Sequence, residues 1–451
     1  MSSPTRRETE GDPAGGAKPL QCAMRRALVL PLTVLIAGTL ACYSDPKADD
    51  AGFGTQAGSS TDSGDSSTTT NDTTTSTDSS TDTSDDTTTD TSDDTTTDSG
   101  CVDPVCFEAG VEIGAGFGPE DVIIADIDGD GVSDIVTANA GGDNIAVLRG
   151  LGGGDFAAPS FYAAGMEPVS VAAVNLDPES SEDAGIDIVV GNRAGQSMSV
   201  LINTGDPVAF GAPLIIPLGD PLVDLAVGNL TLDSNFESVV GAIGDQGILV
   251  THGTGMAIAG DLDAVPTTAP AVAVTAGFLT QDPYSDFISI SNVAPSLTVV
   301  HFLAVDPYFD IFDLLIADAG DDLALASLNA DPHPDLVVAS RALGIITIFP
   351  GDGNGMFATP TPISVEVGPD SLAVGDVDDD GKVDVVFGSS GASEVGLMFG
   401  NGDTTLAAPL PYEVGMRPLA VALADLNGDG QLDIVTANAD GDNVTVLLST
   451  P

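Results

Sequence analysis

The chain has 451 residues, with 68 Asp and Glu against 11 Lys and Arg, a formal net charge of −57 at pH 7 and no Trp. A nucleic-acid-binding function is close to excluded, because such proteins need clustered cations to neutralise phosphates. Wholesale disorder is also excluded, since 42% of the residues are hydrophobic and the mean hydropathy is +0.22, which leaves enough apolar surface to bury a core.

Residues 1–42 are predicted to form a secretory signal segment. A basic stretch from Met24 to Arg26 precedes an apolar run from Ala27 to Leu40, which is too short for a stable bilayer-spanning helix. The end of the run resembles a bacterial lipobox, in which Cys42 would be lipidated. An ordinary signal peptide cut nearby is the alternative. Met24 is a candidate translation start. We expect an exported protein of the cell envelope or outer membrane, in contact with the membrane only through a lipid anchor.

Residues 43–100 consist almost wholly of Ser, Thr, Asp and Gly. Such a stretch buries little and its charges repel, so we expect a disordered tether. Cys101 and Cys106 follow it, separated by four residues. In an exported protein two Cys this close favour a local disulfide. A metal site is the alternative, but it lacks a second pair or a nearby His.

Residues 107–451 repeat one unit about every 50 residues. The clearest copies carry an acidic loop that begins at Asp126, Asp376 and Asp425, and a weaker copy begins at Ser327. Further copies near Asn175, Asn229 and Gly277 keep the flanking apolar runs but lose or stretch the acidic loop. The spacing therefore predicts seven units.

Each unit contains four short β-branched or alternating runs bounded by Gly, Asp and Asn. In the first unit they are residues 122–125, 134–138, 144–148 and 160–163. Such runs are typical of strands joined by tight turns. Seven four-stranded units predict an all-β fold, a seven-bladed β-propeller that forms one domain over residues 101–451. A solenoid is the alternative, but a β-helix would have a much shorter period.

The last unit ends at Pro451, directly after its third predicted strand, residues 443–448. Residues 107–119 occupy the place that residues 411–418 hold before the seventh unit. We therefore expect an N-terminal strand to complete the last blade and close the ring, which removes the open sheet edges.

The acidic loops and a recurring Phe-x-x-Pro element together resemble the FG-GAP, or VCBS, repeat family, which includes the propeller heads of integrin alpha chains. The element occurs at Phe156–Pro159, Phe210–Pro213 and Phe357–Pro360, and with Leu at Leu406–Pro409. The resemblance covers the chain after residue 106 and is weak in the third and fourth units. It implies a propeller whose loops bind calcium.

The loop spacing by itself predicts Ca²⁺ binding. Positions 1, 3, 5 and 9 offer side-chain oxygens and position 7 a backbone carbonyl, as in the first nine positions of an EF-hand loop, while Gly at position 6 permits the turn. Asx turns without a metal are the alternative. The predicted ligands are Asp126, Asp128, Asp130, Val132 and Asp134; Asp376, Asp378, Asp380, Lys382 and Asp384; and Asp425, Asn427, Asp429, Gln431 and Asp433. Asn329, Asp331 and Asp335 form a weaker fourth candidate. We expect about three structural Ca²⁺ ions, with the fourth left open.

No catalytic constellation emerges, because His252, His301 and His333 lie far apart in sequence and outside any nucleophile or zinc motif. The leading hypothesis is a non-enzymatic, lipid-anchored propeller that binds a protein or glycan partner. The scarcity of aromatic residues favours a protein over a glycan, and the net charge favours a basic one. An enzyme acting on a polysaccharide, built on a carboxylate pair in the propeller mouth, is the alternative. A purely structural envelope component is a third.

Overall fold

The computed structural model describes residues 34–35, 105–174, 176, 186–205, 208–228, 238–243, 247–252, 263–280, 286–302 and 309–450. The predicted tether, Cys42, Cys101 and all of the predicted signal segment except residues 34–35 lie outside this part of the chain. Within the described residues, no helix has the length and apolar character needed to cross a membrane.

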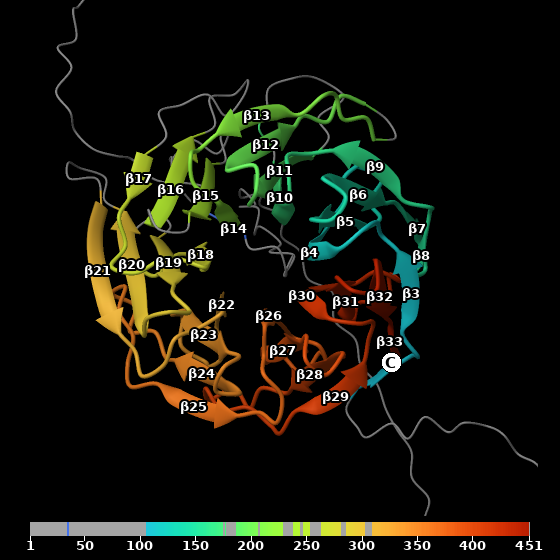
Figure 1. Ribbon diagram of the computed structural model, residues 1–451. Coiled ribbons are helices and arrows are strands. Elements are labelled where there is room, and N and C mark those ends of the chain that lie inside the picture. The colour runs from blue at the N-terminus through green and yellow to red at the C-terminus, as the bar shows by residue number, and fades with distance from the viewer. Residues whose placement is uncertain are drawn as a thin grey trace, which may run out of the picture. The chain divides into compact units, whose positions relative to one another are not determined.

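Seven antiparallel sheets of four propeller strands each stand side by side around a ring (Figure 1), which confirms the predicted all-β, seven-bladed β-propeller. From the centre outward, blades 1 to 3 are β4 (Pro119–Ala125), β5 (Asp134–Asn139), β6 (Asn144–Leu148) and β9 (Ser160–Ala163); β10 (Pro168–Val174), β11 (Asp187–Asn192), β12 (Ser197–Leu201) and β13 (Leu214–Pro217); and β14 (Leu222–Gly228), β15 (Ser238–Ile243), β16 (Gly247–His252) and β17 (Asp263–Val265).

Blades 4 to 7 continue the same order around the ring. They are β18 (Ala273–Gly277), β19 (Asp286–Ile290), β20 (Ser296–Phe302) and β21 (Phe309–Leu315); β22 (Asp322–Ala326), β23 (Asp335–Ser340), β24 (Ile345–Phe349) and β25 (Thr361–Ser364); β26 (Ser371–Gly375), β27 (Asp384–Ser389), β28 (Glu394–Met398) and β29 (Leu410–Glu413); and β30 (Pro418–Ala424), β31 (Asp433–Asn438), β32 (Asn443–Leu447) and β3 (Val111–Gly114).

The N-terminal end of the domain closes the ring, as predicted. β3 is the outer strand of blade 7 and pairs antiparallel with β32, with Val111 opposite Val446. A second pair joins β2 (Cys106–Phe107) to β33 (Ser449–Thr450). Cys106 is disulfide-bonded. Two segments more than 300 residues apart in sequence therefore hold the first and last blades together.

Three short strands lie outside this scheme. β7 (Gly150–Gly152) and β8 (Asp155–Phe156) form a small hairpin between the third and fourth strands of blade 1. β1 (Val34–Leu35) pairs with the inner strand of blade 3, with Val34 opposite Gly228.

The hydrophobic core lies between neighbouring blades. One cluster joins Ile123, Val136 and Val147 of blade 1 to Val171 and Ile188 of blade 2, and the same arrangement recurs between blades 5 and 6. The second strand of a blade is covered on both faces, so β5, β11, β23, β27 and β31 are buried at every position. This is why those strands have continuous apolar runs rather than strict alternation.

The Phe-x-x-Pro element contributes to these interfaces. The Phe210 ring packs edge-on against Tyr162 of the preceding blade, with ring centroids 5.0 Å apart, and Phe156 packs into the core between blades 7 and 1. The element thus fastens the connection between the third and fourth strands to the neighbouring blade.

Candidate functional site

The acidic loops join the first and second strands of a blade. In blade 1 the Asp126 carboxylate accepts the amides of Asp130 at 3.1 Å and Gly131 at 2.9 Å, and Asp130 accepts the amide of Val132 at 2.9 Å. Gly131 has a φ of 86°, a left-handed conformation that a residue with a Cβ rarely adopts. These bonds fold the loop so that its carboxylates gather on one side.

Two of the three strong loops bring carboxylates close enough to share an ion. Oxygens of Asp126, Asp128 and Asp130 all lie within 4.8 Å of one another, and so do those of Asp376, Asp378 and Asp384. Ca²⁺ prefers such oxygen donors at about 2.3–2.6 Å. The donor sets of both loops therefore fit the predicted ion.

The third strong loop, in blade 7, folds like the other two. Asp425 accepts the amide of Gly430 at 2.9 Å, Asn427 accepts the amide of Asp429 at 2.8 Å, and Asp429 accepts the amide of Gln431 at 2.9 Å. In the weaker loop of blade 5 the Asn329 amide nitrogen donates to the Asp335 carboxylate at 3.3 Å. Asn329 therefore presents an N–H donor, rather than an oxygen, to Asp335 at the ninth loop position. In the same loop Asp331 accepts the amide of His333 at 2.9 Å.

The ninth position of the loop has a structural role that its sequence pattern did not reveal. Asp134 is 1% exposed, and its two oxygens accept the amides of Ile127 at 2.9 Å and Gly150 at 2.8 Å. Asp187 does the same in blade 2, with the amides of Leu176 and Asn203. Because blade 2 lacks the acidic loop motif, this Asp holds the blade together whether or not the loop carries ligands.

Burial perturbs several of these loop carboxylates. Desolvation raises the pKa of Asp134 and of Asp384 to about 6, although the hydrogen bonds from backbone amides oppose it. Burial is the largest cause of the raised pKa of Asp378, and the charge of the neighbouring Asp380 carboxylate adds to it. A bound cation would offset this penalty, because it favours the charged form of each ligand.

In two of the loops a cationic side chain contacts the carboxylates. The Arg149 guanidinium donates to Asp128 at 2.7 Å and lies 3.9 Å from Asp130. In blade 6 the Lys382 ammonium group pairs with Asp380 and lowers the pKa of that carboxyl. No ion pair of the described residues reaches Asp425 or Asp429 in blade 7, so the three loops differ in the positive charge that a metal ion must compete with.

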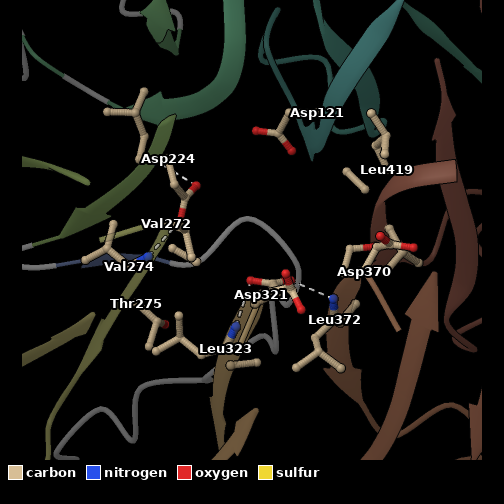
Figure 2. Close-up of a pocket in the computed structure, with 18 of the residues that line it drawn as sticks. Asp121, Asp224, Val272, Val274, Thr275, Asp321, Leu323, Asp370, Leu372 and Leu419 are labelled. Carbon is tan, nitrogen blue, oxygen red and sulfur yellow. Dashed lines mark hydrogen bonds between the residues drawn. The ribbon is translucent and has the colours of Figure 1, made fainter. Parts of the chain in front are cut away.

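A second group of carboxylates lies in a central cavity of about 220 Å³ lined by the inner strands of all seven blades. Asp121, Asp224 and Asp322 reach it from β4, β14 and β22, near the beginning of each strand. Figure 2 shows Asp121, Asp224, Asp321 and Asp370 around the same open space. The sequence patterns did not predict that these carboxylates lie together. The only signal was an Asp at one position of the inner strand in alternate blades.

The three inner carboxylates, which we call the cavity trio, each link two blades. The Asp121 carboxylate accepts two backbone amides, that of Val122 at 2.8 Å and that of Val171 in blade 2 at 2.8 Å. Asp224 accepts the amide of Val274 in blade 4, and Asp322 accepts that of Leu372 in blade 6. The trio therefore fastens blade 1 to 2, 3 to 4 and 5 to 6.

Burial raises the pKa of every member of the cavity trio. The pKa is about 6 for Asp121 and about 7 for Asp322, and that of Asp224 lies well above its ordinary value. Desolvation is the largest cause in each, and the other acids of the group add to it: the carboxylates of Asp121 and Asp322 both raise the pKa of Asp224.

The fold and the acidic loops define a β-propeller with oxygen-rich loops between the first and second strands of its blades. Residues 328–387 and 376–436 match the family of FG-GAP-like repeats. The chain therefore carries FG-GAP-like repeats on a seven-bladed propeller. The matched region runs from the loop of blade 5 into β31 of blade 7 and includes the strong loops of blades 6 and 7.

Solved structures share the fold. The BP39L lectin from Burkholderia pseudomallei has a TM-score of 0.56 and 16% identity, over 74% of this chain and 96% of that one. BBS1N in complex with ARL6DN, soaked with lead, has a TM-score of 0.54 and 12% identity, over 76% of this chain and 98% of that one. The sequence has no significant match among curated proteins. At these identities the likeness concerns the fold alone.

Proposed function

We propose that the protein is an exported, calcium-stabilised propeller that binds a macromolecular partner without catalysing a reaction. The observation that carries this proposal is the pair of carboxylate clusters, each with oxygens within 4.8 Å of one another, placed at equivalent positions of blades 1 and 6. Calcium in these loops would stiffen the connections between first and second strands. A rigid ring with variable loops is a suitable support for a binding surface.

The proposed partner is a protein with a basic surface, and a glycan is the second choice. With a formal charge of −57, the chain attracts positively charged partners and repels acidic ones. Sugar-binding sites commonly stack sugar rings on aromatic side chains, and aromatic residues make up only 5% of this chain.

Binding can be tested with the calcium-loaded protein on a panel of basic proteins and on a glycan array. We expect saturable binding to a basic protein, and we expect this binding to be lost in EGTA and weakened in the Asp376→Ala variant. Binding that survives EGTA unchanged would overturn the calcium-dependent part. The release of reducing sugars from a polysaccharide panel would overturn the non-enzymatic part.

The proposed export and lipid anchor rest on the sequence of residues 24–42. Metabolic labelling with a fatty acid is expected to mark the wild-type protein but not the Cys42→Ala variant. Equal labelling of the two would contradict the lipid anchor and leave a cleaved signal peptide as the account of this segment.

A polysaccharide-active enzyme is the second candidate, and the cavity trio favours it. A carboxyl whose pKa is raised to about 7, as for Asp322, can act as a general acid near neutral pH. The cavity of about 220 Å³ is smaller than the roughly 300–1,000 Å³ typical of ligand pockets, which weighs against a polymer. An Asp322→Asn variant that loses activity in the polysaccharide panel would support the enzyme.

A further inference from the structure

The central cavity holds more negative charge than its structural role requires. In blade 2 the Ser170 hydroxyl occupies the position of the cavity trio and accepts the amide of Leu225 in blade 3 at 3.1 Å. A neutral side chain therefore fastens blade 2 to blade 3. Aspartate at the same position of blades 1, 3 and 5 adds three half-buried carboxyl groups that the link between blades does not need.

Two acids at the rim of the cavity pair with arginines, whereas the cavity trio does not. Glu120 pairs with Arg193 at 2.9 Å, and Asp370 pairs with Arg341 at 2.9 Å. Among the ion pairs of the described residues, none includes a member of the trio. Asp224 Oδ1 accepts the Leu225 amide at 2.8 Å and the Ser170 hydroxyl at 3.2 Å. In contrast, Asp224 Oδ2 and both oxygens of Asp322 each accept one amide and retain a second lone pair.

A second observation at the same place is independent of the acids. The Thr275 and Ser371 side chains line the cavity and are 1% and 6% exposed, and neither hydroxyl has a hydrogen-bond partner. Figure 2 shows Thr275 in the cavity wall, beside Leu323. Buried polar groups are nearly always paired, so two unpaired hydroxyls in one cavity point to a ligand that supplies the missing partner.

The geometry distinguishes between classes of cation. Among the described residues, three carboxylates bring their oxygens within 4.8 Å of one another only in the two acidic loops, so the trio does not form a compact metal cage. Apolar side chains, among them Val169, Val272 and Leu419, also line the cavity. An ion with an alkyl chain suits such walls, whereas a bare metal ion requires several oxygens at short range.

We propose that the central cavity binds a primary alkylammonium cation, with the ammonium group held by charge attraction among Asp121, Asp224 and Asp322 and hydrogen-bonded to the nearest of these carboxylates, and the alkyl chain lying against apolar side chains of the wall. An ammonium group has three donors and no acceptor, and it faces a ring of acceptors. The volume of about 220 Å³ accommodates a short amine and excludes a larger polymer. This site is separate from the acidic loops and from the proposed macromolecular partner.

Isothermal titration calorimetry of the full chain with n-butylammonium tests the proposal, with CaCl₂ held at about 5 mM so that the loops are saturated. Neutral n-butanol is the matched ligand control. We expect saturable binding of the ammonium and none of the alcohol. Asp322→Asn should weaken binding about tenfold, as expected for loss of a charge-assisted hydrogen bond. Glu413→Gln, an exposed change on the outer strand β29, should leave the affinity within about twofold.

Thr275→Val provides a variant that should fold, because the Thr275 hydroxyl makes no hydrogen bond in the protein and the two side chains have similar shape. It should weaken n-butylammonium binding about threefold. Binding that is absent in the wild type, equal for the alcohol, or unaffected by both cavity variants would overturn the proposal. Loss of one bound Ca²⁺ in Asp322→Asn would also overturn it, since the cavity would then be a metal site.

Discussion

The acidic loops and the cavity trio lie at opposite ends of the inner strands and are assembled in different ways. Asp121 lies near the beginning of β4, whereas the loop starting at Asp126 follows its end. Loop ligands come from nine consecutive residues and range from exposed, as for Asp130, to fully buried, as for Asp134. The cavity trio comes from three blades, about 100 residues apart in sequence, and is half-buried in the wall of the cavity, where desolvation is strong. Similar carboxylates therefore meet different physical conditions in one ring.

This difference has consequences for charge. Exposed loop carboxylates are screened by water and can bind or release a metal ion at modest cost. In the cavity, desolvation is the largest cause of the raised pKa values, so protons compete with any cation there. The loops should respond mainly to calcium and the cavity mainly to pH and to amines.

Calcium removal should have the largest effect. With a dissociation constant of about 0.5 mM, about 5 mM Ca²⁺ stabilises each site by about 1.4 kcal/mol, or roughly 4 kcal/mol for three sites. The melting temperature should fall by about 6 °C when EGTA replaces calcium. Differential scanning calorimetry measures the shift, and coincident melting curves in the two buffers would contradict the calcium loops.

Replacing Asp187, the Asp at the ninth loop position of blade 2, should have the second largest effect on stability. Asp187→Ala leaves the amides of Leu176 and Asn203 without their carboxylate acceptor, which should cost about 3 kcal/mol. The loss should be the same with calcium or EGTA, because blade 2 lacks the acidic loop motif. Urea unfolding gives the values, with Asp376→Ala as the matched variant whose loss should be larger with calcium than in EGTA. A calcium-dependent loss in Asp187→Ala would contradict the structural assignment.

The cavity trio should make the protein less stable as pH rises. The folded-state pKa values of about 6 for Asp121 and about 7 for Asp322 exceed the ordinary 3.8, so the folded state binds more protons between pH 4 and 7. The stability that these two groups contribute is fully present below about pH 4 and is lost as the pH rises through 7, at about 1.4 kcal/mol for each unit by which a pKa is raised.

Urea unfolding in EGTA at several pH values measures this dependence. The Asp322→Asn variant should show a flatter profile than the wild type, whereas Glu413→Gln should follow the wild type. A wild-type stability that rises steadily from pH 5 to 7.5 would be the opposite of the expected sign.

Arg149→Ala should have the smallest effect. Its guanidinium lies 2.7 Å from Asp128 and competes with a metal ion in the first loop. Because the side chain is partly exposed, removing it should tighten calcium binding in that loop by only about threefold. A fluorescence or calorimetric calcium titration can resolve one tighter site. Weaker binding in the variant would show that Arg149 organises the loop instead.

The sequence supported the fold well because its information is local and repeated. The loop at Asp126, the turns and the apolar runs define a blade, and the incomplete last unit predicted the pairing of residues 107–119 with the final blade, now seen as β3 and β32. The cavity trio could not be predicted this way, because Asp121 becomes a neighbour of Asp224 only when the ring closes.

The ninth loop position shows a different limit. Asp134 and Asp187 follow loops of different sequence, yet both accept two amides. Local spacing assigned Asp134 as a ligand, whereas recurrence of the same Asp in a blade without the motif identifies a fold requirement. Asp134 retains lone pairs that can face a metal ion, so its structural bonds are compatible with the predicted role.

The most direct test is a crystal structure of the protein grown with both calcium and n-butylammonium. The account predicts Ca²⁺ density in the loops, at about 2.3–2.6 Å from oxygens of Asp126, Asp128 and Asp130 and their counterparts. It predicts an ammonium group, and no metal ion, among the cavity trio. Loops without metal density at saturating calcium, or Ca²⁺ bound by Asp121, Asp224 and Asp322, would contradict it.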